Sequence, residues 1–278
     1  MASLGFVVEE KRCTRCGACA RDCITHIIRQ EGASLPAIMP GDEANCLQCQ
    51  HCLAVCPTGA VSILGRNPDR SIPLGENAFP TFDQQATLIR GRRSVRQYRD
   101  ENVPAAEIKR LLDAVANSPT GCNNRQLTFT VIDDRAVMAR LRERTINCLA
   151  AAQKAGKDAE GPSFVWDAIA AWRERKVDVI FRGAPHALIV SAPPTAPCAM
   201  EDVTIALSYF ELLAHCAGLG TVWCGMLKFV MQVAPELKAL VGVPADHPFY
   251  CMMFGKPAVR YPRAIQRDDG ATVRRVVL

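Results

Sequence analysis

Two copies of one cysteine pattern open this chain, and they constrain it more than any other feature. In each copy, two residues separate the first three cysteines from one another, and three residues separate the third from the fourth. A repeat of this kind does not arise readily by chance, so we interpret it as a set of metal ligands. Eight of the fourteen cysteines belong to the two copies, namely Cys13, Cys16, Cys19 and Cys23, then Cys46, Cys49, Cys52 and Cys56.

The spacing favours two [4Fe–4S] clusters with crossed ligands. Two-residue spacing lets three thiolates from one tight loop face the same cubane. The fourth cysteine is expected to start a helical turn that leads away from that cubane, so it should ligate the other cluster. On this prediction cluster one takes Cys13, Cys16, Cys19 and Cys56, and cluster two takes Cys46, Cys49, Cys52 and Cys23.

Over residues 5–65 the pattern resembles that of the bacterial two-cluster ferredoxins. Zinc is the alternative, but structural zinc commonly takes four ligands as two separated pairs. The resemblance departs in one respect, because Pro57 follows the second copy whereas Ile24 follows the first. We therefore expect the local environments of the two clusters to differ. The nearby His26 and His51 are expected to be ordinary surface histidines.

The net charge and the first residues of the chain indicate which partners and which cellular location to expect. Residues 1–12 carry charges early and lack the apolar stretch of a secretory signal, so a reducing, cytoplasmic setting is expected. The net charge of +5 is too weak to indicate a nucleic-acid partner. The other six cysteines are expected to be small buried hydrophobic residues, and they are Cys122, Cys148, Cys198, Cys216, Cys224 and Cys251.

The most apolar stretch of the chain, residues 203–227, does not predict a membrane span. It contains Glu211 and His215, and Gly218 and Gly220 interrupt it. A buried helix followed by a strand explains this stretch better. We therefore expect no membrane partner.

Residues 66–81 are polar, rich in glycine and proline, and without periodicity, which is typical of a linker. This predicts a first domain over residues 1–65 and a second over 82–278. The second domain reads as α+β and contains neither a glycine-rich dinucleotide turn nor a P-loop. Its expected helices are one that begins at Pro104 and buries Ile108, Leu111, Leu112 and Val115, and three more over 133–149, 163–175 and 199–217. Its expected strands cover 127–132, 187–192, 221–224 and 249–254.

Residues 90–98 are rich in arginine and stand before an expected helix. Arginine side chains fork onto phosphate oxygens and serine adds a hydroxyl donor, so the segment predicts a phosphate and flavin site. An exposed helix edge is the alternative. The segment resembles the Arg-x-Ser-x-(Arg/Lys) element that opens the nitroreductase family and contacts FMN there. The matching residues are Arg92, Arg93, Ser94 and Arg96.

Three further elements follow in the order that this family has them. Residues 119–126 resemble its Pro-(Ser/Thr)-Gly-x-Asn-x-(Gln/Arg) turn against the flavin ring, although Gln126 is offset by one position, which leaves the ring contact open. Residues 218–225 resemble its Gly-Leu-Gly-(Thr/Ser)-x-Trp loop, and residues 255–257 its Gly-x-Pro turn, with basic residues downstream that reach the phosphate. The positions that the resemblance implies as FMN contacts are Pro119, Thr120, Gly121, Asn123, Arg125, Gly220, Thr221, Trp223, Arg263 and Arg267.

The resemblance covers residues 88–267 and implies a central, mostly antiparallel sheet flanked by helices. It also implies FMN bound across a homodimer interface, with the 199–217 helix either at that interface or in the core. Phe164, Trp166 and Trp172 fall where the family often caps its substrate pocket, although plain packing explains each of them equally well. Catalytic residues stay unassigned, and Cys122 and Cys224 are taken as packing residues.

The two resemblances together imply an iron–sulfur flavoprotein oxidoreductase. Electrons from ferredoxin or flavodoxin, or from NAD(P)H, would pass through the two clusters to FMN. The acceptor would be a small electrophile such as a nitroaromatic, a quinone or an activated alkene. One alternative is a non-catalytic relay to a partner redox protein, and another is a second domain that has lost its flavin and serves as a scaffold.

Overall fold

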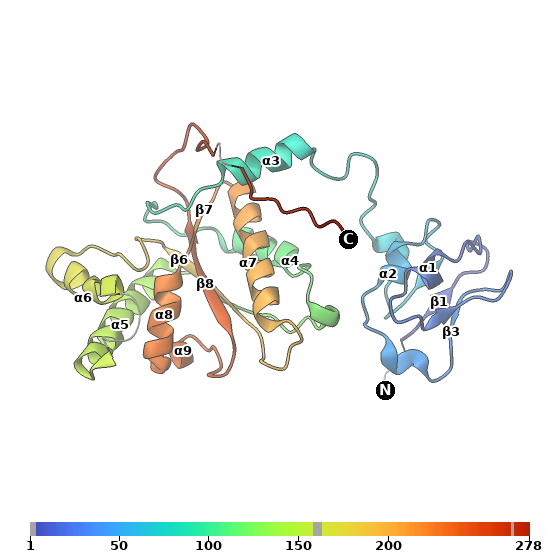
Figure 1. Ribbon diagram of the computed structural model, residues 1–278, viewed down its shortest axis with the longest axis horizontal. Helices are drawn as coiled ribbons and strands as arrows, with labels where there is room; N and C mark the ends of the chain where they lie inside the picture. The colour runs from blue at the N-terminus through green and yellow to red at the C-terminus, as the bar shows by residue number, and fades with distance from the viewer. Residues whose placement is uncertain (1–3, 158–162, 268–269) are drawn as a thin grey trace. The chain divides into compact units, whose positions relative to one another are not determined.

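The computed structural model of the protein describes residues 4–157, 163–267 and 270–278. The chain divides into two compact units. One comprises residues 1–80 together with Cys122–Asn124, and the other comprises Thr81–Gly121 and the chain from Arg125 onward. The helices and strands of both units are labelled in Figure 1.

The N-terminal unit is built from two short antiparallel strand pairs around the cysteine loops. β1 (Val7–Val8) pairs with β4 (Val61–Ser62), and β2 (Ile28–Arg29) pairs with β3 (Ala37–Ile38). The helical segments between them are α1 (Ala18–Arg21), η1 (Asp42–Asn45), α2 (His51–Ala54) and η2 (Pro68–Arg70). A small apolar core lies between the pairs, and its buried members include Ile27, Ile28, Leu53, Val61 and Ile63.

One local prediction in this unit is wrong. The fourth cysteine of each copy was expected to start a helical turn, but each short helix contains the third cysteine and ends before the fourth. Gly17 and Gln50 precede these helices with positive φ of 71° and 62°, a conformation that reverses the chain sharply. The turn therefore directs Cys19 and Cys52 toward the interior of the unit, and both residues are buried.

The C-terminal unit centres on a four-stranded antiparallel sheet in the order β5-β6-β8-β7. Its strands are β5 (Thr128–Ile132), β6 (His186–Ser191), β7 (Gly220–Trp223) and β8 (Phe249–Gly255). This confirms the predicted α+β class with an antiparallel sheet and helices on both sides. The helices are α3 (Phe82–Gly91), α4 (Ala105–Val115), α5 (Arg135–Lys154), α6 (Ser163–Arg175), α7 (Ala199–Cys216), α8 (Gly225–Val233) and α9 (Pro235–Leu240), with the short η3 turn at Gly121–Asn123.

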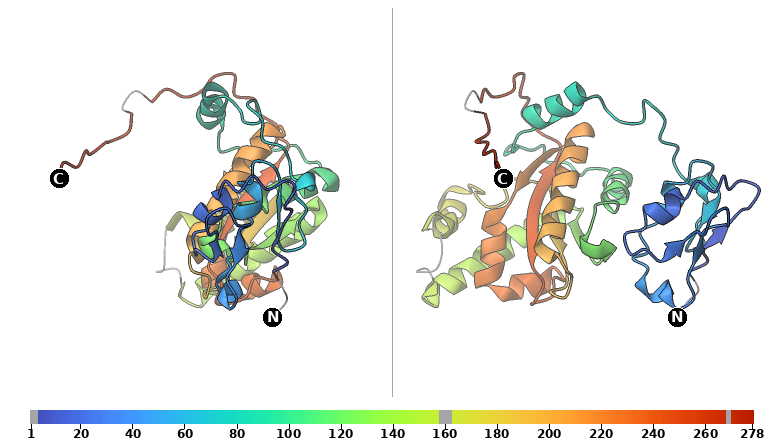
Figure 2. Two further views of the ribbon diagram at one scale, coloured as in Figure 1. Left: turned by 90° about the vertical axis from the view of Figure 1, so that its right-hand side faces the viewer. Right: turned by 45° about the vertical axis from the view of Figure 1, so that its right-hand side comes forward.

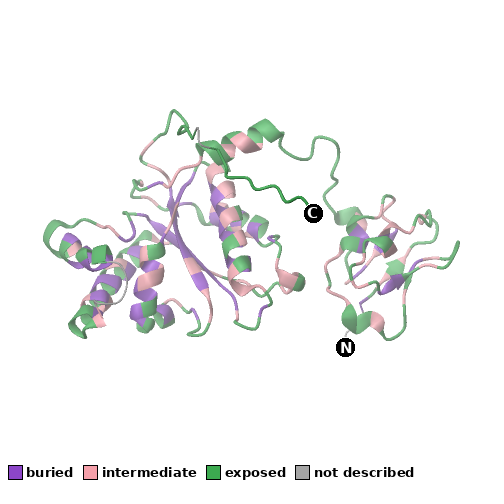
Figure 3. Ribbon diagram, viewed as in Figure 1, coloured by how far each residue is buried: buried purple, intermediate pink, exposed green. Residues whose placement is uncertain are grey.

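Strand periodicity places one hydrophobic cluster on each face of the sheet. Ala187 and Ile189 of β6 join the cluster beneath α5, α6, α8 and α9, whereas Leu188 and Val190 join the cluster beneath α4 and α7. Figure 2 shows these helices on opposite faces of the sheet, and the two central strands are mostly buried in Figure 3. Because both faces are covered, the central strands are almost wholly apolar.

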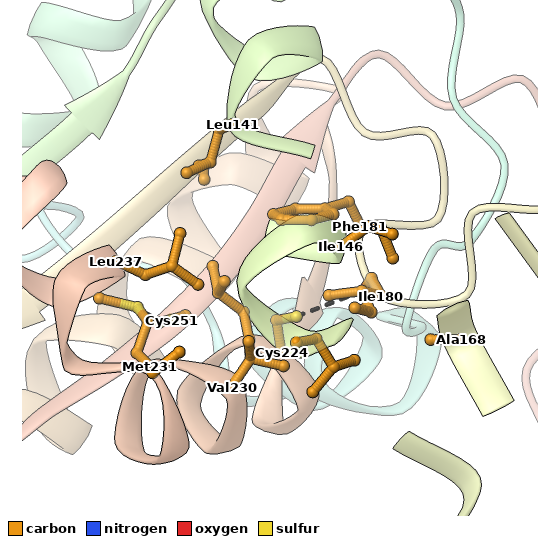
Figure 4. Close-up of a cluster of buried hydrophobic side chains, with 14 of the residues drawn as sticks. Leu141, Ile146, Ala168, Ile180, Phe181, Cys224, Val230, Met231, Leu237 and Cys251 are labelled. Atoms are coloured by element: carbon orange, nitrogen blue, oxygen red, sulfur yellow. Dashed lines mark hydrogen bonds between the residues drawn. The ribbon is translucent and has the colours of Figure 1, made fainter. Parts of the chain in front are cut away.

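Two scattered cysteines lie in the first of these clusters, and two others do not. Cys224 and Cys251 are buried there, and the Cys224 thiol donates to the Ile180 carbonyl at 3.3 Å (Figure 4). Cys122 and Cys216 are exposed, which corrects the expectation that all six are buried and that Cys122 is a packing residue. Cys148 and Cys198 are half-buried.

Most of the expected elements are confirmed, and three helices were missed. Helix α6 has the predicted bounds, while α5 runs to Lys154, five residues beyond its predicted end. Helices α3, α8 and α9 were not predicted. Because α3 ends at Gly91, the arginine-rich segment follows a helix instead of standing before one. No helix of the described ranges is both long and apolar enough to cross a membrane.

A buried histidine at the start of β6 predicts how stability depends on pH. The His186 side chain is fully buried, and its Nε2 accepts a hydrogen bond from the Val103 N–H at 2.8 Å. Burial lowers the pKa of His186 from its usual 6.5, against an opposing effect of the Ile132 backbone and the nearby carboxylates. The unfolded chain then takes up this proton at a higher pH than the folded chain.

We therefore expect the free energy of unfolding to fall as the pH drops below about 6.5, by up to about 1.4 kcal/mol for each unit of depression of the pKa. Urea denaturation at pH 8 and pH 5.5 measures it. His186→Gln keeps an acceptor for Val103 but cannot be protonated, so its loss of stability over this range should be smaller. An equal loss in both proteins would contradict the assignment.

Candidate functional site

A cavity in the N-terminal unit brings together cysteines from both copies of the pattern. Three of its lining cysteines, Cys46, Cys49 and Cys52, come from the second copy, and Cys23 comes from the first. Five isoleucines also line it, Ile28 among them, together with Thr25, Leu47, Gln50 and His51. These four cysteines are the set predicted for cluster two.

The complementary set is joined by electrostatic interactions between thiols. Cys56 of the second copy interacts with Cys16 and Cys19 of the first, and Cys13 also interacts with Cys19. Cys19 of the first copy also interacts with Cys52 of the second, so these interactions link the two predicted sets to each other as well. The crossed arrangement of ligands stays a prediction from the spacing.

The backbone repeats the same contacts in both copies, 33 residues apart. The Arg15 N–H donates to the Cys13 sulfur, and the Gln48 N–H donates to the Cys46 sulfur, each at 3.4 Å. Arg15 and Gln48 both have positive φ, near 55°, which is uncommon for residues with a side chain. Conformations of this kind concentrate where a loop must aim its N–H groups at a ligand.

The fourth cysteines have the environment of thiolates. Burial opposes ionisation of Cys23, but the Thr25 hydroxyl and the N–H groups of Ile27 and Ile28 more than offset it, so the pKa of Cys23 is lowered. For Cys56 burial is again the largest effect, and the N–H groups of Ala60 and Thr58 and the Thr58 hydroxyl lower its pKa overall. The Ala60 N–H lies 3.2 Å from the Cys56 sulfur.

The third cysteines have the opposite bias. Burial raises the pKa of Cys19, and it raises that of Cys52 to about 12. A buried thiol of this kind becomes a thiolate when iron supplies the compensating positive charge. The cavity thus joins one hydrogen-bonded fourth sulfur, that of Cys23, with one buried third sulfur, that of Cys52, and four thiols around one space fit an iron–sulfur cluster.

In the C-terminal unit, the arginine-rich segment runs beside the edge of the sheet. Ser94 forms a parallel bridge with Thr221 of β7, and the Val95 N–H donates to the Thr221 carbonyl at 2.8 Å. A Cβ at Gly220 would lie only 2.6 to 2.8 Å from the side-chain carbons of Val95, so the close approach requires glycine there. The first and third predicted elements therefore lie side by side.

The same segment is held on its far side by the fourth element. The Arg99 N–H donates to the Lys256 carbonyl and the Ala258 N–H donates to the Gln97 carbonyl, both at 2.9 Å. The Tyr98 hydroxyl donates to the Val95 carbonyl at 2.8 Å. Burial raises the pKa of Tyr98, so the hydroxyl keeps its proton and this bond.

Helix α7 anchors the arginines through two residues that the sequence analysis did not assign to the site. The Arg92 guanidinium lies 3.5 Å from the buried carboxylate of Glu211. The Arg93 N–H donates to His215 Nε2 at 3.3 Å, which leaves the proton on Nδ1, 3.0 Å from the Glu211 carbonyl oxygen. In the sequence, Glu211 and His215 stand out only as polar residues in an apolar stretch, and nothing local links them to the arginines.

The first residues of the predicted flavin turn are held by the start of the same helix. The Gly121 N–H donates to Asp202 Oδ1 at 2.9 Å, and a Cβ on Gly121 would meet Cys198 at 2.9 to 3.3 Å. Asp202 is buried, and it too was missed because nothing in its local sequence marks it. Asn123 belongs to the N-terminal unit, where its amide donates to the Leu47 carbonyl.

Backbone strain marks the rest of this turn. Cys122, Asn123 and Arg125 all have φ of 52°, in the left-handed region, and the Arg125 N–H is held by the Thr120 hydroxyl at 3.0 Å. Such strain costs about 1–3 kcal/mol per residue, and it concentrates at ligand-binding sites. Pro119 and Arg125 are exposed, whereas Thr120 and Gly121 are half-buried.

Of the remaining residues predicted to contact FMN, some lie at the sheet edge and others lie in the segment after β8. Thr221 is fully buried, and its hydroxyl has no hydrogen-bond partner among the described residues, which marks it as a group whose partner is to be explained. Trp223 packs edge-to-face on Tyr250, with ring centroids 5.3 Å apart. Arg263 and Arg267 are exposed in the segment that follows β8, outside any helix or strand.

Arg92, Arg93 and Arg96 flank Ser94, whose backbone bridges Thr221 at the edge of the sheet, and the Thr221 hydroxyl has no partner among the described residues. An anionic ligand with hydrogen-bonding groups fits this donor set.

Two family models match the chain. The model described as "Nitroreductase family" matches residues 89–256, more than half of the chain, and the model described as "4Fe-4S dicluster domain" matches residues 12–60. Both ranges fall where the corresponding resemblances were seen in the sequence. The fusion that the two resemblances predicted is thereby confirmed.

Curated relatives match the same region at low identity. A Methanothermobacter thermautotrophicus protein, provisionally named an NADH dehydrogenase/NAD(P)H nitroreductase, is 26% identical over 176 residues, which are 61% of this chain and 75% of the relative. The iodotyrosine deiodinase of Thermotoga neapolitana is 24% identical over 183 residues, covering 63% of this chain and 91% of the relative.

Solved structures show the same fold. An FMN-bound nitroreductase from Desulfitobacterium hafniense superposes with a TM-score of 0.55 at 20% identity, over 70% of this chain and all of that one. An FMN-bound nitroreductase from Bacteroides fragilis gives 0.53 at 22% identity, over 68% of this chain and 98% of that one. At this identity the likeness shows the fold alone.

Proposed function

The chain belongs to the nitroreductase family, and from this premise we propose that it is an iron–sulfur flavoprotein oxidoreductase. Two [4Fe–4S] clusters would receive single electrons, and FMN would pass them in pairs to a small electrophilic acceptor. The observation that carries the proposal is the cavity that unites Cys23 with Cys46, Cys49 and Cys52. Flavin chemistry alone would not require this cysteine centre, whereas electron delivery to a flavin would.

The proposal assigns the ligands of both clusters and the domain bounds. Residues 1–65 would form the cluster domain, 66–81 the linker and 82–278 the flavin domain. Each cluster carries one electron at a time, at a potential set by its charge, hydrogen bonds and exposure. Cluster one would be held by Cys13, Cys16, Cys19 and Cys56, and cluster two by Cys46, Cys49, Cys52 and Cys23.

Arg92, Arg93, Ser94 and Arg96 would hold FMN at the β7 edge as donors to its phosphate, together with Thr221 and Trp223. Bound FMN supplies the two-electron chemistry that the clusters lack. The arginines would stabilise the negative charge of the reduced flavin because their charges are already in place. The full proposed set is Arg92, Arg93, Ser94, Arg96, Pro119, Thr120, Gly121, Asn123, Arg125, Gly220, Thr221, Trp223, Arg263 and Arg267.

The residues of the chain itself position this set. His215 and Glu211 hold the Arg92–Arg93 backbone and guanidinium against α7, and Asp202 holds the turn at Gly121. The chain would act as a homodimer, with nitroaromatics, quinones or activated alkenes as acceptors and reduced ferredoxin or flavodoxin as the donor. No side chain is assigned as a general acid, because hydride transfer from a flavin needs none.

The test compares three donors on the loaded full-length protein: reduced ferredoxin, NADH and NADPH. In a Cys16→Ala/Cys49→Ala variant, which lacks one ligand of each cluster, we expect reduction of FMN by ferredoxin to be slower by about tenfold or more. Reduction by NADH should change little. The flavin absorbance, followed anaerobically in a stopped-flow instrument, measures both rates.

Three outcomes would contradict the proposal in different ways. If NADH reduces FMN in the variant as fast as ferredoxin reduces it in the wild type, the clusters are not the point at which electrons enter the protein. Reoxidation that is slow with every small acceptor but fast with a redox protein would indicate a relay. A protein with iron–sulfur absorbance but no releasable flavin would indicate a scaffold.

A further inference from the structure

The two halves of the N-terminal unit share one backbone plan, but their charges differ. Helices α1 and α2, the cysteines and the N–H contacts to sulfur all repeat 33 residues apart. The stretch from Arg12 to Cys23 contains three arginines and one aspartate, whereas the equivalent stretch from Asn45 to Cys56 contains no arginine, lysine, aspartate or glutamate. Differences between two otherwise equivalent sites can therefore be traced to a few side chains.

Arg21 places a positive charge against the first set of cysteines. Its Nη1 donates to the Cys16 carbonyl at 2.7 Å. No carboxylate of the described chain lies within ion-pair distance of Arg21, so its charge is not balanced locally. The equivalent residue beside the second set is the neutral, exposed Ala54.

Arg12 lies on the other side of the first set. Its Nε donates to the Thr58 carbonyl at 3.0 Å, which places the guanidinium across the turn that follows Cys56. Asp69 accepts two hydrogen bonds from it at 2.8 and 3.1 Å, so part of its charge is balanced. Arg12 thus contributes less than Arg21, and its equivalent is the neutral Asn45.

Asp22 has the reverse effect on the second set. Its carboxylate lies 3.2 Å from His51 Nδ1, and the two residues adjoin Cys23 and Cys52 respectively. The residue equivalent to Asp22 beside the first set is the uncharged Val55. The second set therefore has a carboxylate where the first has a hydrocarbon.

We propose that cluster one, on Cys13, Cys16, Cys19 and Cys56, has the higher reduction potential, and that Arg21 is the main residue that raises it. An added electron makes a cluster more negative, so a nearby cation favours the reduced state and a nearby carboxylate disfavours it. This inference rests on the ligand sets of the proposed function. It adds that the first electron taken up by the protein resides on cluster one.

The test is a potentiometric titration of the loaded full-length protein, followed by electron paramagnetic resonance. We expect two separate reduction steps. When the reduced and oxidised forms of cluster one are equal, the ratio of reduced to oxidised cluster two should be about one to ten. This ratio corresponds to a difference of about 59 mV between the two reduction potentials. Arg21→Gln should lower the upper step only, and Arg21→Lys should restore it.

The matched gain of charge is Ala54→Arg, at an exposed position of α2 that tolerates a long side chain. This substitution should raise the potential of the lower reduction step only. The double variant Arg21→Gln/Ala54→Arg should narrow or reverse the difference between the two reduction potentials. A single unresolved wild-type step, or an Arg21→Gln shift of the lower step, would overturn the inference while leaving the proposed function intact. Iron content short of two full clusters would overturn the proposed function itself.

Discussion

Changing Cys23 to alanine is expected to remove the cluster held mainly by the second copy of the cysteine pattern. Cys23 lines one cavity with Cys46, Cys49 and Cys52, although it follows the first copy in sequence. Cys23→Ala should therefore lose about half of the iron, since losing a ligand to a buried cluster commonly destroys it. Iron analysis and the electron paramagnetic resonance of the reduced protein measure the loss.

Pairs of substitutions distinguish crossed from uncrossed ligation. Adding Cys52→Ala to Cys23→Ala should remove no further iron, because both cysteines serve one cluster. Adding Cys19→Ala should remove nearly all of it. The reverse result, with Cys23→Ala/Cys52→Ala emptying both sites, would establish uncrossed ligation. Cys216→Ala is the matched control, because this cysteine is exposed at the end of α7 and outside both copies.

Changing Gly220 to alanine is expected to damage both stability and flavin binding. The new Cβ would lie 2.6 to 2.8 Å from the side chain of Val95, which is itself buried. Overpacking of this kind costs about 1–3 kcal/mol. The forced shift of Val95 would also stretch its hydrogen bond to Thr221 and displace the adjoining Arg92–Arg96 segment. Urea denaturation measures the stability, and FMN fluorescence on titration measures the affinity.

Two further variants separate the clash from a general effect of losing glycine. Gly218 has a positive φ of 76°, and a Cβ added there would meet no atom within 4 Å, so Gly218→Ala should cost only about 1 kcal/mol of backbone strain. It should leave FMN affinity nearly unchanged. Val95→Gly introduced into Gly220→Ala removes the Val95 Cβ as well as both methyl groups, so it should restore part of the lost FMN affinity. Failure of this rescue would show that the close approach is not what requires glycine at position 220.

Helical and strand periodicity in the sequence was sufficient to predict much of the fold. One further local signal, the capping box at the start of α3, was present in the sequence but did not enter the prediction. Helix α6 has its predicted bounds because apolar residues recur at helical spacing from its first turn. Helix α3 was missed although Thr81 and Gln84 form a reciprocal capping box at its start, a signal readable from sequence. The glycine-rich stretch before it favoured a linker, and α3 has no buried residue whose periodicity would have marked it.

The anchors of the arginine segment show the limit of sequence reasoning. Glu211 and His215 meet Arg92 and Arg93 from about 120 positions away in sequence, and Asp202 meets Gly121 from 81 positions away. Glu211 and His215 are polar residues in an apolar stretch, which marks them as unusual but names no partner, and nothing in its local sequence marks Asp202. Their roles depend on how α7 packs against the sheet edge, and that packing has no local signature.

What the sequence by itself determined is the chemistry of the N-terminal unit, because eight thiolate ligands at one repeated spacing restrict the metal groups they can hold. It also determined the fold class of the rest, since strand and helix periodicities are local properties. Only the tertiary structure decided which arginine stands beside which set of cysteines and which residues of α7 hold the arginine segment. These are contacts between distant positions, and they exist only after the hydrophobic clusters on both faces of the sheet have set the elements in place.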